Sequence, residues 1–189
     1  AVAAGLAEAA CAYELGDPLD PATTLGPMVS AAAAESVRAQ IDAAQASGAR
    51  RLVGPDRFGT DAGTGSPYCA PEVLVDVDHS MAVMAEETFG PIVGVMAVAD
   101  DDAAVGLMND SAYGLSASIW TRDLATGAVL ADRVQAGTVF LNRADYLDPA
   151  LAWTGVKDSG RGATLSSVGF QHLTRPKSHY SRPMPAVRS

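Results

Sequence analysis

Between Tyr68 and Asn142, short apolar runs alternate with helical patterns, and this alternation is the strongest constraint on the fold. The apolar, β-branched runs predict strands at Val73–Val77, Ile92–Val98, Ser116–Thr121 and Gly137–Asn142. Helices are predicted between the later strands, at Asp101–Asn109 and at Leu124–Val134 with Asp123 at its start. Strands joined by crossover helices run parallel, so the sequence predicts an α/β fold with a mostly parallel sheet and flanking helices.

The first 67 residues add two predicted helices and an exposed loop. An Ala-rich helix over 1–14 ends at Gly16-Asp17-Pro18, and a second helix over 31–47 follows Ser30, whose hydroxyl suits an N-cap. A short strand is predicted at Arg51-Leu52-Val53, and the Gly- and Pro-rich residues 54–67 are predicted to form a loop. With 189 residues, 48% of them hydrophobic, the chain can bury one sizeable core.

Residues 143–189 are less regular. Residues 143–162 lack periodicity and contain Pro149 and three glycines, which predicts a long loop of the kind that is usually functional. Thr174–Tyr180 is predicted to be one more strand, at the edge of a sheet. The chain is therefore expected to consist of a domain over 1–173 and an edge strand with a tail over 174–189.

The charge distribution argues against a nucleic-acid-binding protein. The net charge is −9, and residues 1–142 carry 19 acidic but only 6 basic side chains, whereas phosphate binding needs clustered Lys and Arg. The basic residues near the C-terminus are few and suit a partner surface or solvent better than phosphate. No apolar run predicts a membrane span, and the first residues lack a basic signal-peptide region. Two cysteines give no disulfide framework, so the cytoplasm is the expected compartment.

Most familiar catalytic motifs are absent from the sequence. It contains no Gly-rich nucleotide loop, no nucleophile elbow and no pair of histidines at metal-binding spacing. His79, His172 and His179 stand apart from one another, and each suits a surface or capping role. Cys11 and Cys69 have no neighbour that would stabilise a thiolate, so both are predicted to be core residues. No metal site is predicted.

One short segment places functional groups at the start of a predicted strand. Glu86-Glu87-Thr88-Phe89-Gly90-Pro91 precedes the apolar run Ile92–Val98, and its Gly-Pro pair predicts a turn. The residues alone leave two interpretations open. The carboxylates and the ring could meet a ligand, or the glutamates could form a solvated helix end with Phe89 in the core.

This hexapeptide resembles the Glu-Glu-x-Phe-Gly-Pro signature of the aldehyde dehydrogenase superfamily, and further segments resemble that family in the expected order. They are Leu15–Asp20 with Thr23–Pro27, Asn109–Ala117, Trp120–Asp123, Gly137–Asn142 and Trp153–Gly160. The last resembles the family's Phe-Gly-Gly-x-Lys-x-Ser-Gly loop but departs from it at Trp153 and Thr154, and no Glu follows Arg161. The resemblance covers nearly the whole chain and implies the C-terminal portion of that family's catalytic domain.

The resemblance implies a reaction in which a cysteine thiolate attacks an aldehyde, hydride passes to NAD or NADP, and a glutamate-activated water hydrolyses the thioester. The family's nucleophile, oxyanion asparagine, general base and Rossmann domain lie N-terminal to the matched portion, and none is found in this sequence. Cys11 follows Glu8-Ala9-Ala10 instead of the Gly-Gln context of the nucleophile. No catalytic residue is therefore assigned, and the isolated chain is expected to be inactive.

The resemblance also implies roles for particular residues. Glu87 would accept hydrogen bonds from the nicotinamide ribose and Phe89 would pack beside the nicotinamide, which makes a partial NAD or NADP site. Asp145, Leu147 and Trp153 would line a tunnel for a small aldehyde, where Leu and Trp favour an apolar or aromatic substrate, although core packing also suits Trp153. Thr174–Tyr180 would join a sheet of a partner subunit, which predicts a homo-oligomer.

Two functions remain as expectations. The chain is the C-terminal part of an aldehyde-oxidising enzyme, or it is a truncated remnant that serves as an assembly or interaction module. A small α/β binding domain outside the family would have to share all of the ordered segments by coincidence.

Overall fold

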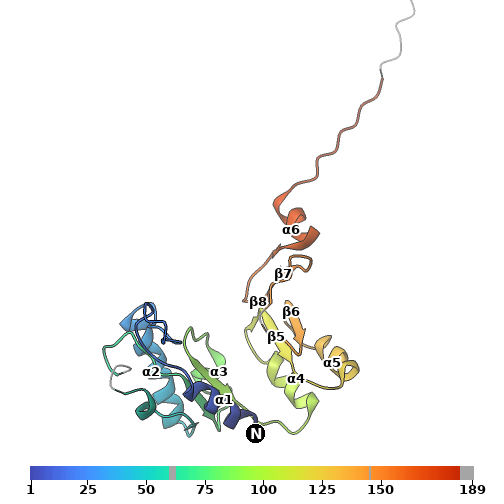
Figure 1. The fold of residues 1–189 in the computed structure, drawn as a ribbon. Helices are drawn as coiled ribbons and strands as arrows, with labels where there is room; N and C mark the ends of the chain where they lie inside the picture. Colours follow the sequence, from blue (N-terminus) through green and yellow to red (C-terminus); the bar gives the residue numbers. More distant parts are fainter. Residues whose placement is uncertain (60–62, 145, 184–189) are drawn as a thin grey trace, which may run out of the picture. The chain divides into compact units, whose positions relative to one another are not determined.

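A computed structural model describes residues 1–59, 63–144 and 146–183 (Figure 1). The chain divides into two compact units, Ala1–Val98 and Ala99–Ser189. Both units combine helices with strands, which is consistent with an α/β fold. The boundary expected after residue 173 stays a prediction.

The first unit combines helices with a three-stranded sheet in the order β1-β2-β3. Strands β2 and β3 are parallel, with Glu72 opposite Ile92, whereas β1 and β2 are antiparallel. The elements in chain order are α1 (Val2–Cys11), α2 (Ala31–Ala46), β1 (Arg50–Arg51), the 3-10 helix η1 (Pro55–Phe58), β2 (Glu72–Val75), α3 (Ala82–Ala85) and β3 (Ile92–Val95).

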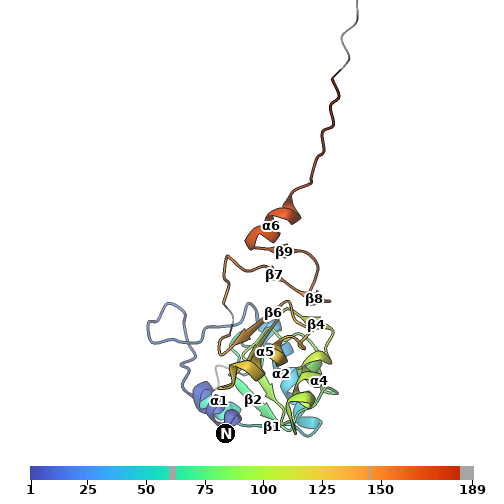
Figure 2. The same cartoon turned by 90° about the vertical axis from the view of Figure 1, so that its right-hand side faces the viewer.

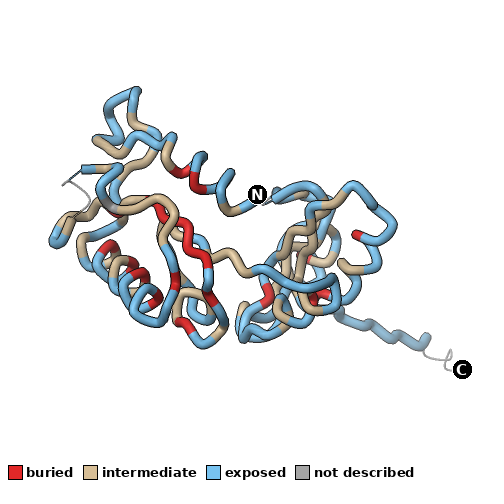
Figure 3. The backbone as a smooth tube through the Cα atoms, turned by 90° about the horizontal axis from the view of Figure 1, so that it is seen from below, coloured by how far each residue is buried: buried red, intermediate tan, exposed pale blue. Residues whose placement is uncertain are grey.

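The core of the first unit lies on both faces of this sheet. Helix α2 packs through Val37 and Ile41 in a cluster with Leu74, whereas Ala10 of α1 belongs to a second cluster with Val73. Because Val73 and Leu74 are consecutive residues of one strand, their side chains point to opposite faces. Helices α1 and α2 therefore cover opposite faces of β2, and Figure 3 shows buried residues in red along all three.

The second unit contains shorter pairings. Strands β5 and β6 are parallel, and the two-residue pairs β4–β8 and β7–β9 are antiparallel. Over the whole chain, the described strands form four small sheets instead of the single, mostly parallel sheet that was predicted. The elements are α4 (Asp101–Asn109), β4 (Tyr113–Gly114), β5 (Ser116–Ile119), α5 (Leu124–Ala131), β6 (Thr138–Leu141), β7 (Trp153–Thr154), β8 (Val156–Lys157), β9 (Ala163–Thr164) and α6 (Ser166–Leu173).

The predicted helix starts are confirmed. Ser30 Oγ accepts a hydrogen bond from the Ala33 N–H at 3.1 Å, and Asp123 Oδ1 accepts from two N–H groups of α5. The Thr126 hydroxyl, which donates to the same carboxylate, contributes most to lowering the pKa of Asp123, followed by these backbone bonds. The longest described helix has 16 residues, and none of those described is long and apolar enough to cross a membrane.

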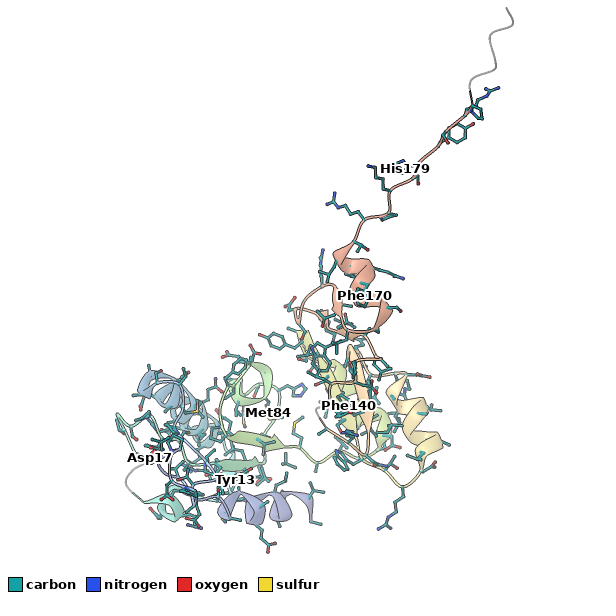
Figure 4. The ribbon with its side chains drawn as sticks, turned by 45° about the horizontal axis from the view of Figure 1, so that its top comes forward. Tyr13, Asp17, Met84, Phe140, Phe170 and His179 are labelled. Atoms are coloured by element: carbon teal, nitrogen blue, oxygen red, sulfur yellow. The ribbon has the colours of Figure 1, made fainter. Side chains whose placement is uncertain are left out.

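The C-terminal part differs from the sequence-based expectations in three places. The predicted loop over 143–162 contains β7 and β8, and helix α6 was not predicted at all. Thr174–Tyr180 was predicted to be a strand, but no strand is assigned over 174–183. A strand needs a partner for its backbone hydrogen bonds, and no described strand pairs with this segment. Figure 4 shows His179 on extended backbone beyond Phe170 and α6.

Candidate functional site

The segment over 86–91 links α3 to β3 and is attached at both ends. The Glu86 N–H donates to the Ala82 carbonyl at 2.8 Å, and the Pro91 carbonyl accepts from the Glu72 N–H at 2.9 Å. Between these points the Gly90 N–H donates to the carbonyl two residues before it, at 3.0 Å, which bends the chain as predicted. The backbone of the hexapeptide is therefore held by its own unit.

Thr88 and Gly90 of this segment face helix α2. The Thr88 hydroxyl donates to Oε1 of Gln40, and a Cβ placed on Gly90 would lie 2.5 Å from Cγ2 of Val37. Val37 is buried, so glycine is the residue that fits at position 90 without displacing the core. The side chains of Glu87 and Phe89, which alternate with Thr88 and Gly90 along the segment, are exposed instead.

Glu87 and Phe89 are consequently surface groups. The Phe89 side chain is 79% exposed, which excludes the interpretation that it is a core residue. Glu87 is also exposed, and its carboxylate makes no hydrogen bond to another described residue. An open carboxylate can accept two hydroxyl groups and a neighbouring open ring can pack against a planar group. The pair thus suits the ribose and nicotinamide of a dinucleotide.

The expected tunnel residues belong to the second unit, and the structure describes two of them, Leu147 and Trp153. Asp145 lies outside the described residues. Leu147 is 56% exposed, whereas Trp153 is half-buried in β7, where it pairs with Thr164 of β9. Trp153 lines an open depression of about 430 Å³, and Leu147 is not among the residues that line it.

The sequence did not predict a hydrogen-bonded junction in the second unit. Lys157 Nζ donates to the carbonyls of Asn109 and Ser111, at 2.7 and 2.9 Å. The hydroxyl of Ser159 accepts from the Gly114 N–H at 2.9 Å. These bonds connect the loop over 153–160 to the segment over 109–117, two of the segments on which the family resemblance rests.

Asn109 and Gly137 extend this junction. Asn109 Oδ1 accepts from the Gln135 N–H at 2.7 Å, and its amide nitrogen donates to the Arg133 carbonyl at 2.9 Å. A Cβ on Gly137 would lie 1.7 Å from the carbonyl oxygen of Thr154, so the two backbones approach as only glycine permits. The polar groups of the junction are used within the chain, and their role is structural.

Glu72 is another residue whose role the sequence did not predict. Its side chain is buried, and Oε2 accepts from Arg51 Nε at 2.6 Å. Oε1 accepts from the N–H groups of Leu52 and Val53, at 3.2 and 2.9 Å. A buried carboxylate with this many donors is a satisfied structural group that joins β1 to β2.

Neither cysteine has the surroundings of a nucleophile. Cys69 is buried, and this burial raises the pKa of its thiol, while Arg38 and Arg51 oppose the shift more weakly. A raised pKa disfavours the thiolate that nucleophilic attack requires. Cys11 is half-buried in α1. Within the described residues, no three His, Cys, Asp or Glu side chains are grouped closely enough to hold a metal ion.

Comparison with known proteins gives a family match along almost the whole chain. The model of the aldehyde dehydrogenase family matches residues 1–179. Betaine aldehyde dehydrogenase 1 of Rhizobium meliloti is 37% identical over 177 residues, which are 94% of this chain and 36% of that protein. The NADP(+) succinate-semialdehyde dehydrogenase of Mycobacterium avium is 35% identical over 88% of this chain and 34% of its own length.

Solved structures agree with this match. Aldehyde dehydrogenase C of Pseudomonas syringae, in complex with NAD+ and octanal, has a TM-score of 0.82 and 35% identity over 90% of this chain and 35% of its own. Succinic semialdehyde dehydrogenase of Streptococcus pyogenes, in complex with NADP+, has a TM-score of 0.79 and 29% identity over 89% of this chain and 36% of its own. The chain spans about a third of the length of these curated relatives. On the strength of the family match and these identities, the chain belongs to the aldehyde dehydrogenase family.

Proposed function

We propose that this chain is the C-terminal, catalytic-domain part of an NAD- or NADP-dependent enzyme that oxidises an aldehyde to a carboxylic acid. The family match, and the third of the relatives' length that the chain spans, support this proposal. The observation that carries it is the exposure of Glu87 and Phe89 on backbone that α2 holds in place.

In this proposal Glu87 and Phe89 hold the nicotinamide end of the cofactor. The Glu87 carboxylate accepts hydrogen bonds from the ribose hydroxyls, and the Phe89 ring packs beside the nicotinamide. The bound nicotinamide supplies the hydride acceptor of the reaction. Gln40 and Val37 contribute indirectly, because their contacts with Thr88 and Gly90 set the direction in which Glu87 and Phe89 leave the backbone.

The substrate is proposed to be a small aldehyde. The relatives are named for betaine aldehyde, which is a cation, and for succinate semialdehyde, which is an anion. Leu147 and Trp153 are proposed to line its tunnel together with Asp145. The exposed side chain of Leu147 and the half-buried indole of Trp153 favour an apolar or aromatic stem.

Assembly with further copies is proposed to use Thr174–Tyr180. This segment is exposed, and the described chain pairs it with no strand. Unpaired backbone groups of this kind can add to the edge of another sheet. The same observation favours the second candidate function, an assembly module without catalysis. The net charge of −9 favours protein and small-molecule partners over nucleic acid, and a cytoplasmic location remains a proposal from cysteine usage.

Binding of nicotinamide mononucleotide tests the proposed cofactor role, because this probe carries the nicotinamide and its ribose without the adenosine half. Nuclear magnetic resonance of the chain should show shifts of the Glu87–Gly90 amides with this probe. Adenosine monophosphate, which lacks the nicotinamide, should not shift these amide resonances. Equal shifts with both nucleotides would contradict the assignment.

Turnover tests the expectation, common to both candidate functions, that the isolated chain is inactive. The isolated chain should form no NADH or NADPH from any aldehyde, because no nucleophile or general base is assigned to it. A turnover rate that disappears on Cys11→Ala would overturn this expectation and make Cys11 the nucleophile.

A further inference from the structure

The depression beside Trp153 has a floor of backbone. It is bordered by β7, β9, the loop between them and His172 of α6, and Figure 2 shows β7, β9 and α6 near one another. Gly160 and Gly162 lie on its floor with φ angles of 117° and 88°, which favour glycine. The Thr154 hydroxyl donates to the Gly162 carbonyl at 2.7 Å and fixes the turn. A ligand can therefore approach the main chain closely.

The charge of the depression is opposite to that of the chain. Arg161 and His172 line it, and none of its lining residues is Asp or Glu, although acidic residues outnumber Lys and Arg by 22 to 13 in the sequence. The Arg161 side chain is exposed and makes no ion pair or hydrogen bond with another described residue. Its guanidinium is thus available to an anion.

Part of the remaining wall is apolar. Trp153 contributes an indole and Leu115 an aliphatic side chain to the same depression. Cation and indole together recognise a molecule with an anionic group and an apolar or aromatic stem.

We propose that this depression binds the far end of an anionic aldehyde, with a carboxylate at Arg161 and the stem against Trp153. The inference rests on the proposed function, which assigns Trp153 to the aldehyde tunnel. A planar guanidinium can donate two parallel hydrogen bonds to a carboxylate, whereas a quaternary ammonium group would meet a like charge. Arg161 is therefore a specificity-determining residue, and the chain selects substrates by charge.

Three ligands of similar shape and different charge test this selection on the full chain. They are para-methylbenzoate, para-methylbenzamide and benzyltrimethylammonium, and none of them requires a cofactor or turnover. Binding is followed by the indole N–H resonance of Trp153, which Trp120→Phe assigns. The anion should bind about tenfold more tightly than the amide. The cation should leave the resonance unmoved.

Substitution of Arg161 identifies the group responsible. Arg161→Gln should weaken para-methylbenzoate about tenfold and leave the amide unchanged, and Arg161→Lys should give an intermediate loss. Arg122→Gln removes an exposed arginine that does not line the depression, and should have no effect. Equal affinities for the three ligands, no shift with any of them, or the same loss in both Gln variants would overturn the inference. None of these outcomes affects nicotinamide mononucleotide binding at Glu87, so the two proposals fail separately.

Discussion

Two regions of this chain carry segments that resemble the same family, and their side chains are placed in opposite ways. In the first unit, Glu87 and Phe89 are exposed on backbone that is held from the other side. In the second unit, Asn109, Lys157 and Ser159 bond to neighbouring backbone groups. A residue that matches a family motif is therefore a candidate ligand contact only where its functional group is exposed and makes no hydrogen bond within the chain.

The glycines of the two regions also differ in the atoms that surround them. Gly137 of the junction meets a backbone carbonyl, which cannot rotate away, whereas Gly90 meets the side chain of Val37. The junction should therefore tolerate substitution less well than the hexapeptide does.

The largest effect is expected for Gly137→Ala. Its new methyl group would lie 1.7 Å from the Thr154 carbonyl oxygen, so the substitution should lower the free energy of unfolding by about 3 kcal/mol or more. The matched control is Gly106→Ala in α4, where nothing lies within 4 Å and helix propensity should add about 0.5–1 kcal/mol. Urea unfolding measures both. Similar stabilities for the two variants would remove the steric account of the junction.

A smaller loss is expected for Gly90→Ala, since a side chain can yield where a carbonyl cannot. The substitution should cost about 1–3 kcal/mol through its contact with Val37. Combining it with Val37→Ala removes the contact. The double variant should therefore lose about 1 kcal/mol less stability than the sum of the two single variants. Strictly additive effects in urea unfolding would show that Gly90 does not face Val37.

Lys157→Met tests the polar half of the junction. Loss of the two bonds to the Asn109 and Ser111 carbonyls should cost about 1 kcal/mol, because the ammonium is partly exposed to water. Lys177→Met, in the exposed C-terminal segment, should stay within about 0.5 kcal/mol of the parent chain. Equal effects of the two methionines in urea unfolding would argue that Lys157 is an ordinary surface lysine.

The smallest effect on stability is expected in the hexapeptide itself. Glu87→Gln and Phe89→Ala remove exposed groups, so each should change the free energy of unfolding by no more than about 0.5 kcal/mol. A loss of several kcal/mol on Phe89→Ala would mean that the ring is packed, and would support the interpretation that Phe89 is a core residue.

Local signals were sufficient for the longer elements. Asp123 and Ser30 mark the starts of α5 and α2, and each makes the capping bond that its residue type predicts. The two-residue strands of the second unit carry no periodicity and depend on their partners, so the sequence cannot indicate them. Helix α6 follows Leu165 at a φ of 61° and begins without a side-chain cap, which removes its usual start signal.

The site depends on contacts that are distant along the chain. The family resemblance selected Glu87 and Phe89, but their exposure follows from the bond between Thr88 and Gln40, 48 residues apart. Glu72 pairs with Arg51, which is 21 residues away in the sequence. The residues next to Glu72 therefore gave no sign of a buried ion pair. Pairings over such distances are set by tertiary packing and leave no local pattern.

Affinity for nicotinamide mononucleotide tests the difference between the two regions most directly. It should be measured for the parent chain, for Glu87→Gln and for Lys157→Met by titration of the Phe89 amide resonance. Glu87→Gln should weaken binding about tenfold, the usual size of a charge-assisted hydrogen bond, while Lys157→Met should leave it unchanged. Unchanged affinity in Glu87→Gln, or an equal loss in both variants, would contradict the assignment of Glu87 as the open ligand contact and Lys157 as a structural residue.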